Sequence, residues 1–74
     1  MSYLKGEQIK IDTPTIKKMI GKKVIYLLEK DIDKSGRGYF SPRTGTITEV
    51  YRKHIDFGNG DFIYFSQVKE IVIK

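Results

Sequence analysis

From Lys22 onward the chain alternates apolar and polar residues over short stretches, and this period of two is typical of half-buried β-strands. The stretches are rich in β-branched and aromatic residues and are separated by turn-forming residues. They predict five strands, within residues 22–29, 44–53, 54–57, 61–66 and 70–73. A long loop rich in Gly, Ser, Pro and Asp follows the first strand, and one tight turn precedes the last. The pattern predicts a mainly β fold, a small closed antiparallel barrel.

A different pattern precedes these strands. Residues 8–11 alternate and predict a short strand, after which Thr13 is expected as a helix N-cap, Pro14 as the first helical residue and Gly21 as the stop. Three apolar side chains then share one helical face, those of Ile16, Met19 and Ile20. This pattern leaves open whether the short helix plugs the barrel or docks elsewhere.

The sequence HIDFGNGDFIYF predicts a hairpin, and its register decides which rings are buried. A two-residue turn at 59–60 would set Phe57 opposite Phe62. A three-residue turn at 58–60, with its last glycine in the left-handed region, sets Phe57 opposite Asp61 and Ile55 opposite Ile63. We favour the second register because it puts the β-branched residues inside. The outer face then carries His54, Asp56, Phe62 and Tyr64, with Phe57 at the rim.

The expected core follows from this register. Its members are the inward-facing residues of the strands, with the helix face covering one end. They are Val24, Tyr26 or Ile25, Ile47, Val50, Ile55, Ile63, Phe65, Val68, Ile71 and Ile73, covered by Ile16, Met19 and Ile20.

Composition narrows the class of protein. Seventy-four residues predict one domain, an N-terminal extension (1–21) followed by the barrel (22–74). Fourteen Lys and Arg against nine Asp and Glu give a net charge of +5, which favours anionic partners, nucleic acid first. The chain has no cysteine, no apolar run long enough to span a membrane and no hydrophobic signal segment, so we expect a cytoplasmic protein without membrane contact.

The stretch IDFGNGDFIYFSQVKEI resembles the signature of Tudor domains. The matching positions are Asp56, Phe57, Gly58, Asn59, Asp61, Ile63, Phe65 and Val68. The resemblance implies an SH3-like barrel and a ligand cage, with Phe57 as one wall, His54 as another and Tyr39 or Phe40 as a third. Aromatic faces around a cation are what recognition of a methylated ammonium group requires. The chain has His54 where the family has an aromatic residue, and it contains no tryptophan.

The stretch GRGYFSPRTGTITEV resembles, more faintly, the KOW segment of translation and transcription factors. Independently of the family, cations and rings gather on this loop and on the next connection. We expect a nucleic-acid-binding face made of Lys34, Arg37, Tyr39, Phe40, Arg43, Arg52 and Lys53. Cations can follow phosphates while rings stack on bases. The alternative is that Tyr39 and Phe40 fold back on the barrel as a lid and the arginines are only solvated.

Other chemistry finds little support in the sequence. DIDKSG (31–36) copies the first half of a calcium loop, but Pro42 stands where the bidentate glutamate is needed. A single histidine, His54, excludes sites built on two imidazoles. A remote enzymatic alternative is the type II dihydrofolate reductase, an SH3-like chain that assembles around a Val-Gln-Ile-Tyr strand; DFIYF has Phe62 at the glutamine. We expect a protein without enzymatic activity that binds no cofactor and no metal.

Two function classes remain. The first is a small module that binds RNA or single-stranded DNA through its basic and aromatic loops. The second is a protein- or peptide-interaction module of the Tudor or SH3 kind, monomeric or weakly dimeric. Its binding face would consist of His54, Phe57, Phe62 and Tyr64.

Overall fold

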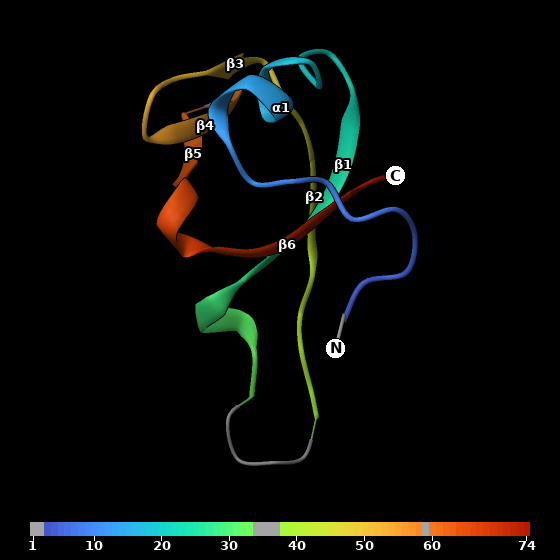
Figure 1. Cartoon of the computed structure of the whole chain (residues 1–74). Coiled ribbons are helices and arrows are strands. Elements are labelled where there is room, and N and C mark those ends of the chain that lie inside the picture. Colours follow the sequence, from blue (N-terminus) through green and yellow to red (C-terminus); the bar gives the residue numbers. More distant parts are fainter. Residues whose placement is uncertain (1–2, 34–37, 59) are drawn as a thin grey trace.

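The computed structural model describes residues 3–33, 38–58 and 60–74, and these form two three-stranded antiparallel sheets and a short helix (Figure 1). The helix α1 spans Thr13–Lys17, and two single-turn 3-10 helices span Glu29–Asp31 (η1) and Phe65–Gln67 (η2). The strands are β1 (Lys23–Leu28), β2 (Arg43–Thr46), β3 (Glu49–Val50), β4 (His54–Gly58), β5 (Asp61–Tyr64) and β6 (Val68–Ile73). The mainly β character predicted from the sequence is confirmed.

The two sheets have the strand orders β2-β1-β6 and β3-β4-β5. The predicted strand 44–53 crosses from one sheet to the other and breaks at the crossing. There the N–H of Ile47 donates to the carbonyl of Lys22 at 3.2 Å, and the N–H of Thr48 donates to the carbonyl of Asp56 at 2.9 Å. Over the described ranges no strand pairing closes the two sheets into the barrel that we expected.

The β4–β5 hairpin has the favoured register. His54 pairs with Tyr64, Asp56 with Phe62 and Ile55 with Ile63. The expectation for Phe57 was wrong, because Gly58 rather than Phe57 lies opposite Asp61 and the register shifts at Phe57. The bulge contains Gly58, with φ of 81°, and the turn contains Gly60, with φ of 80°. Residues other than glycine rarely adopt such positive φ angles.

The main core lies between the sheets and α1. It contains most of the predicted residues: Ile16, Val24, Tyr26, Ile47, Val50, Ile55, Ile63, Val68 and Ile71, with Met19 and Phe65 packed against it. Two predictions were wrong, since Ile20 is 40% and Ile73 is 48% exposed. Because α1 ends at Lys17, helical spacing no longer places Ile20 on the inner face. Ile73 is the last paired residue of β6, where the sheet ends.

A second apolar cluster covers the outer face of β1 and β6, and the sequence pattern did not predict it. It consists of Leu4, Leu27 and Val72, with Ile25 and Ile32 packed against them. The N-terminal segment is attached to β6 by the buried carboxylate of Glu70. This carboxylate accepts the N–H of Tyr3 at 2.7 Å and the N–H of Leu4 at 2.8 Å. The predicted strand at 8–11 is reduced to one bridge between Gln8 and Val72.

Helix α1 docks at one end of the molecule, beside β3, so the question of its position is answered (Figure 1). Its N-cap is Asp12 and not Thr13: the carboxylate of Asp12 accepts the N–H of Thr15 at 2.9 Å. Thr13 instead donates its hydroxyl to the carbonyl of Arg52 at 3.3 Å. The fully buried Ile16 and this hydrogen bond fix α1 against the turn between β3 and β4.

Candidate functional site

Four rings gather on the outer face of the β3-β4-β5 sheet, and we call them the ring cluster: Tyr51, His54, Phe62 and Tyr64. His54 lies at its centre, with its ring stacked on that of Tyr51 at 4.5 Å and 18°. The rings of Phe62 and Tyr64 approach His54 edge-on at 5.4 Å and 6.1 Å. Phe62 is 52% and Tyr64 47% exposed, so the cluster presents aromatic surface to solvent.

The register of the hairpin explains why these rings meet. Alternate residues of a strand point to the same face, and paired residues of neighbouring strands lie side by side on that face. His54 and Tyr64 form such a pair, and Phe62 is two residues away on β5. Tyr51 joins them because its N–H donates to the carbonyl of His54 at 2.9 Å, which closes the turn around Arg52 and Lys53.

Sequence reasoning missed Tyr51. The available signal was its place near the end of the predicted strand 44–53, three residues before His54, where a tight turn can bring both side chains to the same side. The sequence predicts that His54, Phe62 and Tyr64 belong to a protein-binding face and that Arg52 and Lys53 belong to a nucleic-acid-binding face. The structure brings these two groups together.

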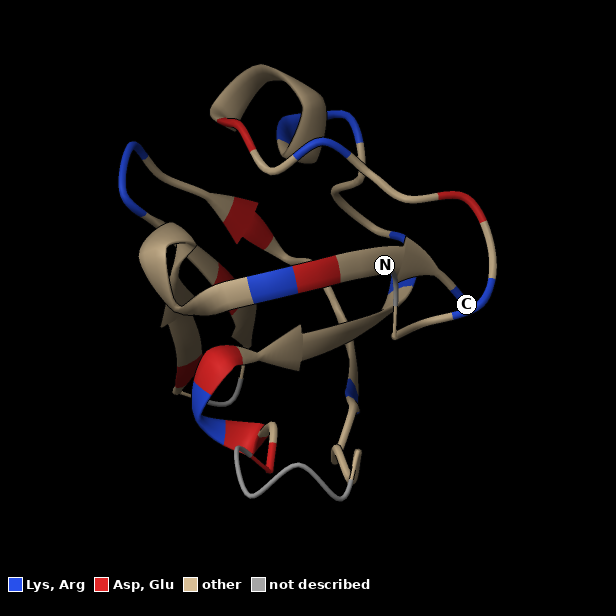
Figure 2. Cartoon of the chain, turned by 60° about the horizontal axis from the view of Figure 1, so that its bottom comes forward, with Lys and Arg blue, Asp and Glu red and all other residues tan. Residues whose placement is uncertain are grey.

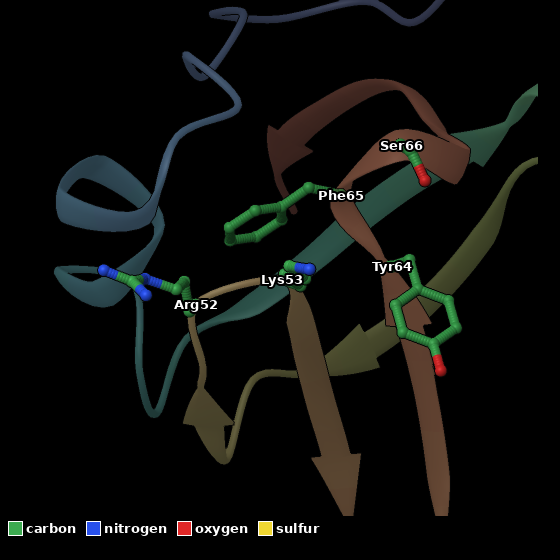
Figure 3. A pocket seen from close by; sticks show the side chains of 5 residues that line it. All are labelled: Arg52, Lys53, Tyr64, Phe65 and Ser66. Carbon is green, nitrogen blue, oxygen red and sulfur yellow. The ribbon is translucent and has the colours of Figure 1, made fainter.

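A pocket of about 280 Å³ adjoins the ring cluster, lined by Arg52, Lys53, Tyr64, Phe65 and Ser66 (Figure 3). Figure 3 shows the amine of Lys53 between the rings of Phe65 and Tyr64, whereas Arg52 extends away from them. The backbone of the pocket is fixed, since the N–H of Phe65 donates to the carbonyl of Lys53 at 2.9 Å. Tyr64 belongs to both the pocket and the ring cluster.

Arg52 and Lys53 are exposed, and the described residues include no carboxylate within salt-bridge distance of either. Arg43, by contrast, is paired: its Nε lies 2.9 Å from a carboxylate oxygen of Asp31, and this hydrogen bond raises the pKa of the guanidinium. A phosphate would have to compete with Asp31 for Arg43, but it can reach Arg52 and Lys53 without displacing a partner.

The predicted basic and aromatic loop face is divided in space. Tyr39 is exposed, and Phe40 packs edge-on against Tyr3 at 5.2 Å rather than on the main core. Their segment lies at the opposite end of the molecule from the turn that carries Arg52 and Lys53 (Figure 1). Lys34 and Arg37 lie outside the described residues.

Phe57, which the sequence placed in the protein-binding face with His54, Phe62 and Tyr64, does not lie on that face. Its ring stacks on Tyr26 with centroids 4.6 Å apart and planes within 7°, and it packs against the main core. The Tudor resemblance implied a cage with Phe57, His54 and a loop ring as its walls. Among the described residues these side chains do not come together as such a cage.

The described residues contain no group of three or more His, Asp or Glu side chains arranged to hold a metal ion. The calcium-like stretch 31–36 is described only as far as Asp33, and Asp31 in it is engaged by Arg43. Within the same described ranges, no helix has the length and apolar character needed to cross a membrane.

Comparison of the chain with models of protein families, with curated proteins and with solved structures finds no match.

Proposed function

We propose that this chain is a non-catalytic module that binds single-stranded nucleic acid, RNA or DNA, through the ring cluster and the adjoining turn. One observation carries the proposal: exposed rings in mutual contact lie directly beside Arg52 and Lys53, two exposed cations that have no carboxylate partner among the residues that the structure describes. Rings supply faces on which bases stack, and cations neutralise the phosphates between those bases.

The pocket supports a single strand over a duplex. A base that stacks on the ring of Tyr64 would bring its phosphate near the amine of Lys53 and the hydroxyl of Ser66, which lines the same pocket. Such stacking needs a base with an accessible face, and a duplex offers such a face only at its ends. Stacking is tolerant of sequence because every base has an aromatic face, so we expect weak sequence preference.

We also propose that the architecture is a small SH3-like barrel of the Tudor-like kind in an open form. The order of elements supports this: a strand, a long connection, a three-strand meander, a single 3-10 turn and a last strand paired with the first. The strand that crosses between the sheets at Ile47 and Thr48 supports it as well. Scalar couplings across hydrogen bonds in solution would test whether further pairs close the barrel.

A second candidate function is a protein- or peptide-interaction module, including weak self-association. The exposure of Phe62 and Tyr64 supports it, since contiguous exposed aromatic surface often marks a protein contact. The two functions differ in their dependence on salt. Binding through phosphates weakens steeply as salt rises, whereas burial of rings against a protein does not.

A titration with fluorescent oligothymidine, oligouridine and a duplex of equal length, at about 50 mM and about 200 mM salt, tests the proposal. We expect single strands to bind more tightly than the duplex and affinity to fall with salt. Tyr64→Ala should weaken binding by about 1–3 kcal/mol, the usual contribution of one stacked base. Tyr39→Ala removes an exposed ring at the other end of the molecule and is the matched control. If the wild-type protein binds none of the oligonucleotides at low salt, the proposal is wrong.

A further inference from the structure

Four exposed lysines outside the candidate site lie on α1, on the connection that follows it and at the start of β1. We call them the lysine end: Lys17, Lys18, Lys22 and Lys23. None of them lies within salt-bridge distance of a carboxylate in the part of the chain that the structure describes. The ion pairs found there are Lys10 with Asp12 and Arg43 with Asp31. The lysine end is therefore open to an external anion.

The lysine end is fixed to the same end of the molecule as the candidate site. The hydroxyl of Thr13, at the start of α1, donates to the carbonyl of Arg52 in the turn beside the ring cluster. Behind α1, the N–H of Gly21 donates to the carbonyl of Ile47 at 2.7 Å. Figure 2 shows basic segments at this end, around α1 and in the turn between β3 and β4.

Carboxylates mark the directions in which a phosphate chain would not run. On the β3-β4-β5 sheet, Glu49 lies opposite Asp56, which pairs with Phe62 of the ring cluster, and Asp61 lies beside the turn at the far end of the hairpin from Arg52 and Lys53. At the other end of the molecule, η1 begins with Glu29 and ends with Asp31. A polyanion that leaves the ring cluster over its basic side reaches the start of α1, where the carboxylate of Asp12 is paired with Lys10 at 3.4 Å, and then the lysine end.

We propose that the lysine end continues the binding surface, so that the ligand is a single strand long enough to lie across both the ring cluster and α1. This inference rests on the proposed function. The lysine end lacks exposed rings in the described residues, since the exposed aromatic side chains lie on other elements. Its contacts are therefore with phosphates, and they add affinity that depends on salt and on strand length but not on base identity.

The test is a length series of oligothymidine, from the lower to the upper end of the roughly 4–16 nucleotides that small single-strand-binding folds cover. The variant is Lys17→Gln with Lys18→Gln, because glutamine favours helix about as well as lysine does. Lys22→Gln with Lys23→Gln is a second variant outside α1. The matched control, Lys5→Gln with Lys30→Gln, removes the same charge from exposed positions on the N-terminal segment and on η1.

For the long strand, each lysine-end variant should lower the slope of log K against log salt by about 1.4, or about 0.7 per phosphate. When salt is raised fourfold, the factor by which affinity falls should then be about seven times smaller for the variant than for the wild type. The short strand should lose no more than it does with the control. A loss with the long strand equal to that of the control would overturn the inference. If Tyr64→Ala still weakens binding in that case, the proposed function survives the failure.

Discussion

The ring of Tyr26 on β1 lies flat against the ring of Phe57 on β4, with their centroids 4.6 Å apart. Tyr26 is buried and Phe57 half-buried, and the two strands belong to different sheets. This stacked pair is therefore a direct side-chain connection between the sheets, and it closes one side of the main core. Stacked rings contribute beyond the area that they bury, by about 0.5–1.5 kcal/mol.

Phe57→Ala should lower the free energy of unfolding by roughly 2–3 kcal/mol, less than for a fully buried phenylalanine because Phe57 keeps some exposure. Phe62→Ala, a change of the same size on the exposed face of the same hairpin, should cost under about 1 kcal/mol. Urea denaturation of both variants measures the difference. Equal losses would mean that Phe57 does not connect the sheets as described.

Gly45 on β2 leaves room for this stack. A Cβ at this position would lie 3.1 Å from Cδ1 of Phe57, closer than side chains normally approach. Gly45→Ala should therefore destabilise the fold by about 1 kcal/mol, although alanine is otherwise preferred to glycine in a strand. In a Phe57→Leu background the same change should become neutral or stabilising. A double-mutant cycle by thermal or urea unfolding measures this coupling, and strict additivity would contradict it.

Acid should release the N-terminal segment before the rest of the fold. Burial by itself would raise the pKa of the Glu70 carboxyl, but the N–H groups of Leu4 and Tyr3 outweigh it and leave the pKa below its ordinary value. A carboxyl with a lowered pKa stabilises the folded state fully above its unfolded pKa, about 4.3, and this contribution is lost as the pH falls through the folded pKa. Stability should thus decline below about pH 4–5.

Glu70→Gln should reduce that decline and lower the protection of the Tyr3 and Leu4 amides against hydrogen exchange. Glu7→Gln, which removes an exposed carboxylate from the same segment, is the control and should change neither. Unchanged protection of both amides in Glu70→Gln would show that the carboxylate does not hold this segment.

Tyr51 should contribute to binding as much as the rings that the sequence predicted. Tyr51→Ala is expected to weaken oligothymidine binding by about 1–3 kcal/mol, through loss of a stacking face and of its contact with His54. Because Tyr51 is exposed, its effect on stability should be small, and a thermal melt checks this. An unaltered affinity would confine the site to the pocket side of the ring cluster.

Self-association should compete with nucleic acid for the ring cluster. The segment from Tyr3 to Ile11 packs on other parts of the molecule and leaves Phe62 and Tyr64 exposed. We expect sedimentation to show a weak dimer at high concentration that oligothymidine dissociates. Phe62→Ser with Tyr64→Ser should give a folded monomer. A dimer that persists in this variant would place the contact elsewhere.

The local parts of the fold could be predicted because adjacent residues determine them. The period of two defined the strands, and the glycines that flank Asn59 determined a register that pairs Ile55 with Ile63. The second apolar cluster depends on pairing between distant segments, which such patterns do not report. A signal was nevertheless present, since the unbroken run from Val24 to Leu28 is typical of a strand buried on both faces.

The candidate site was predicted in two halves that the sequence alone could not join. Arg52 and Lys53 were grouped with Tyr39 and Phe40 because all of them lie on loops, yet the fold separates these loops. The pairing of Arg43 with Asp31 could not be predicted from the sequence either, because the two residues are twelve positions apart and come into contact only in the folded chain. Residue type identified the chemistry, whereas three-dimensional proximity decided which groups act together.

The pairing of β1 with β6 bears on how the chain acquires its fold during synthesis. Val24 pairs with Ile73, a separation of 49 positions (73 minus 24). Until β6 has been synthesised, one edge of β1 and its apolar run have no partner. Long-range pairing of this kind slows folding, and such an edge invites contact with other nascent chains. The pairing of β1 should therefore be completed only after β6 has been synthesised. Before that point the unpaired edge of β1 is exposed, and chaperones should matter most at that stage.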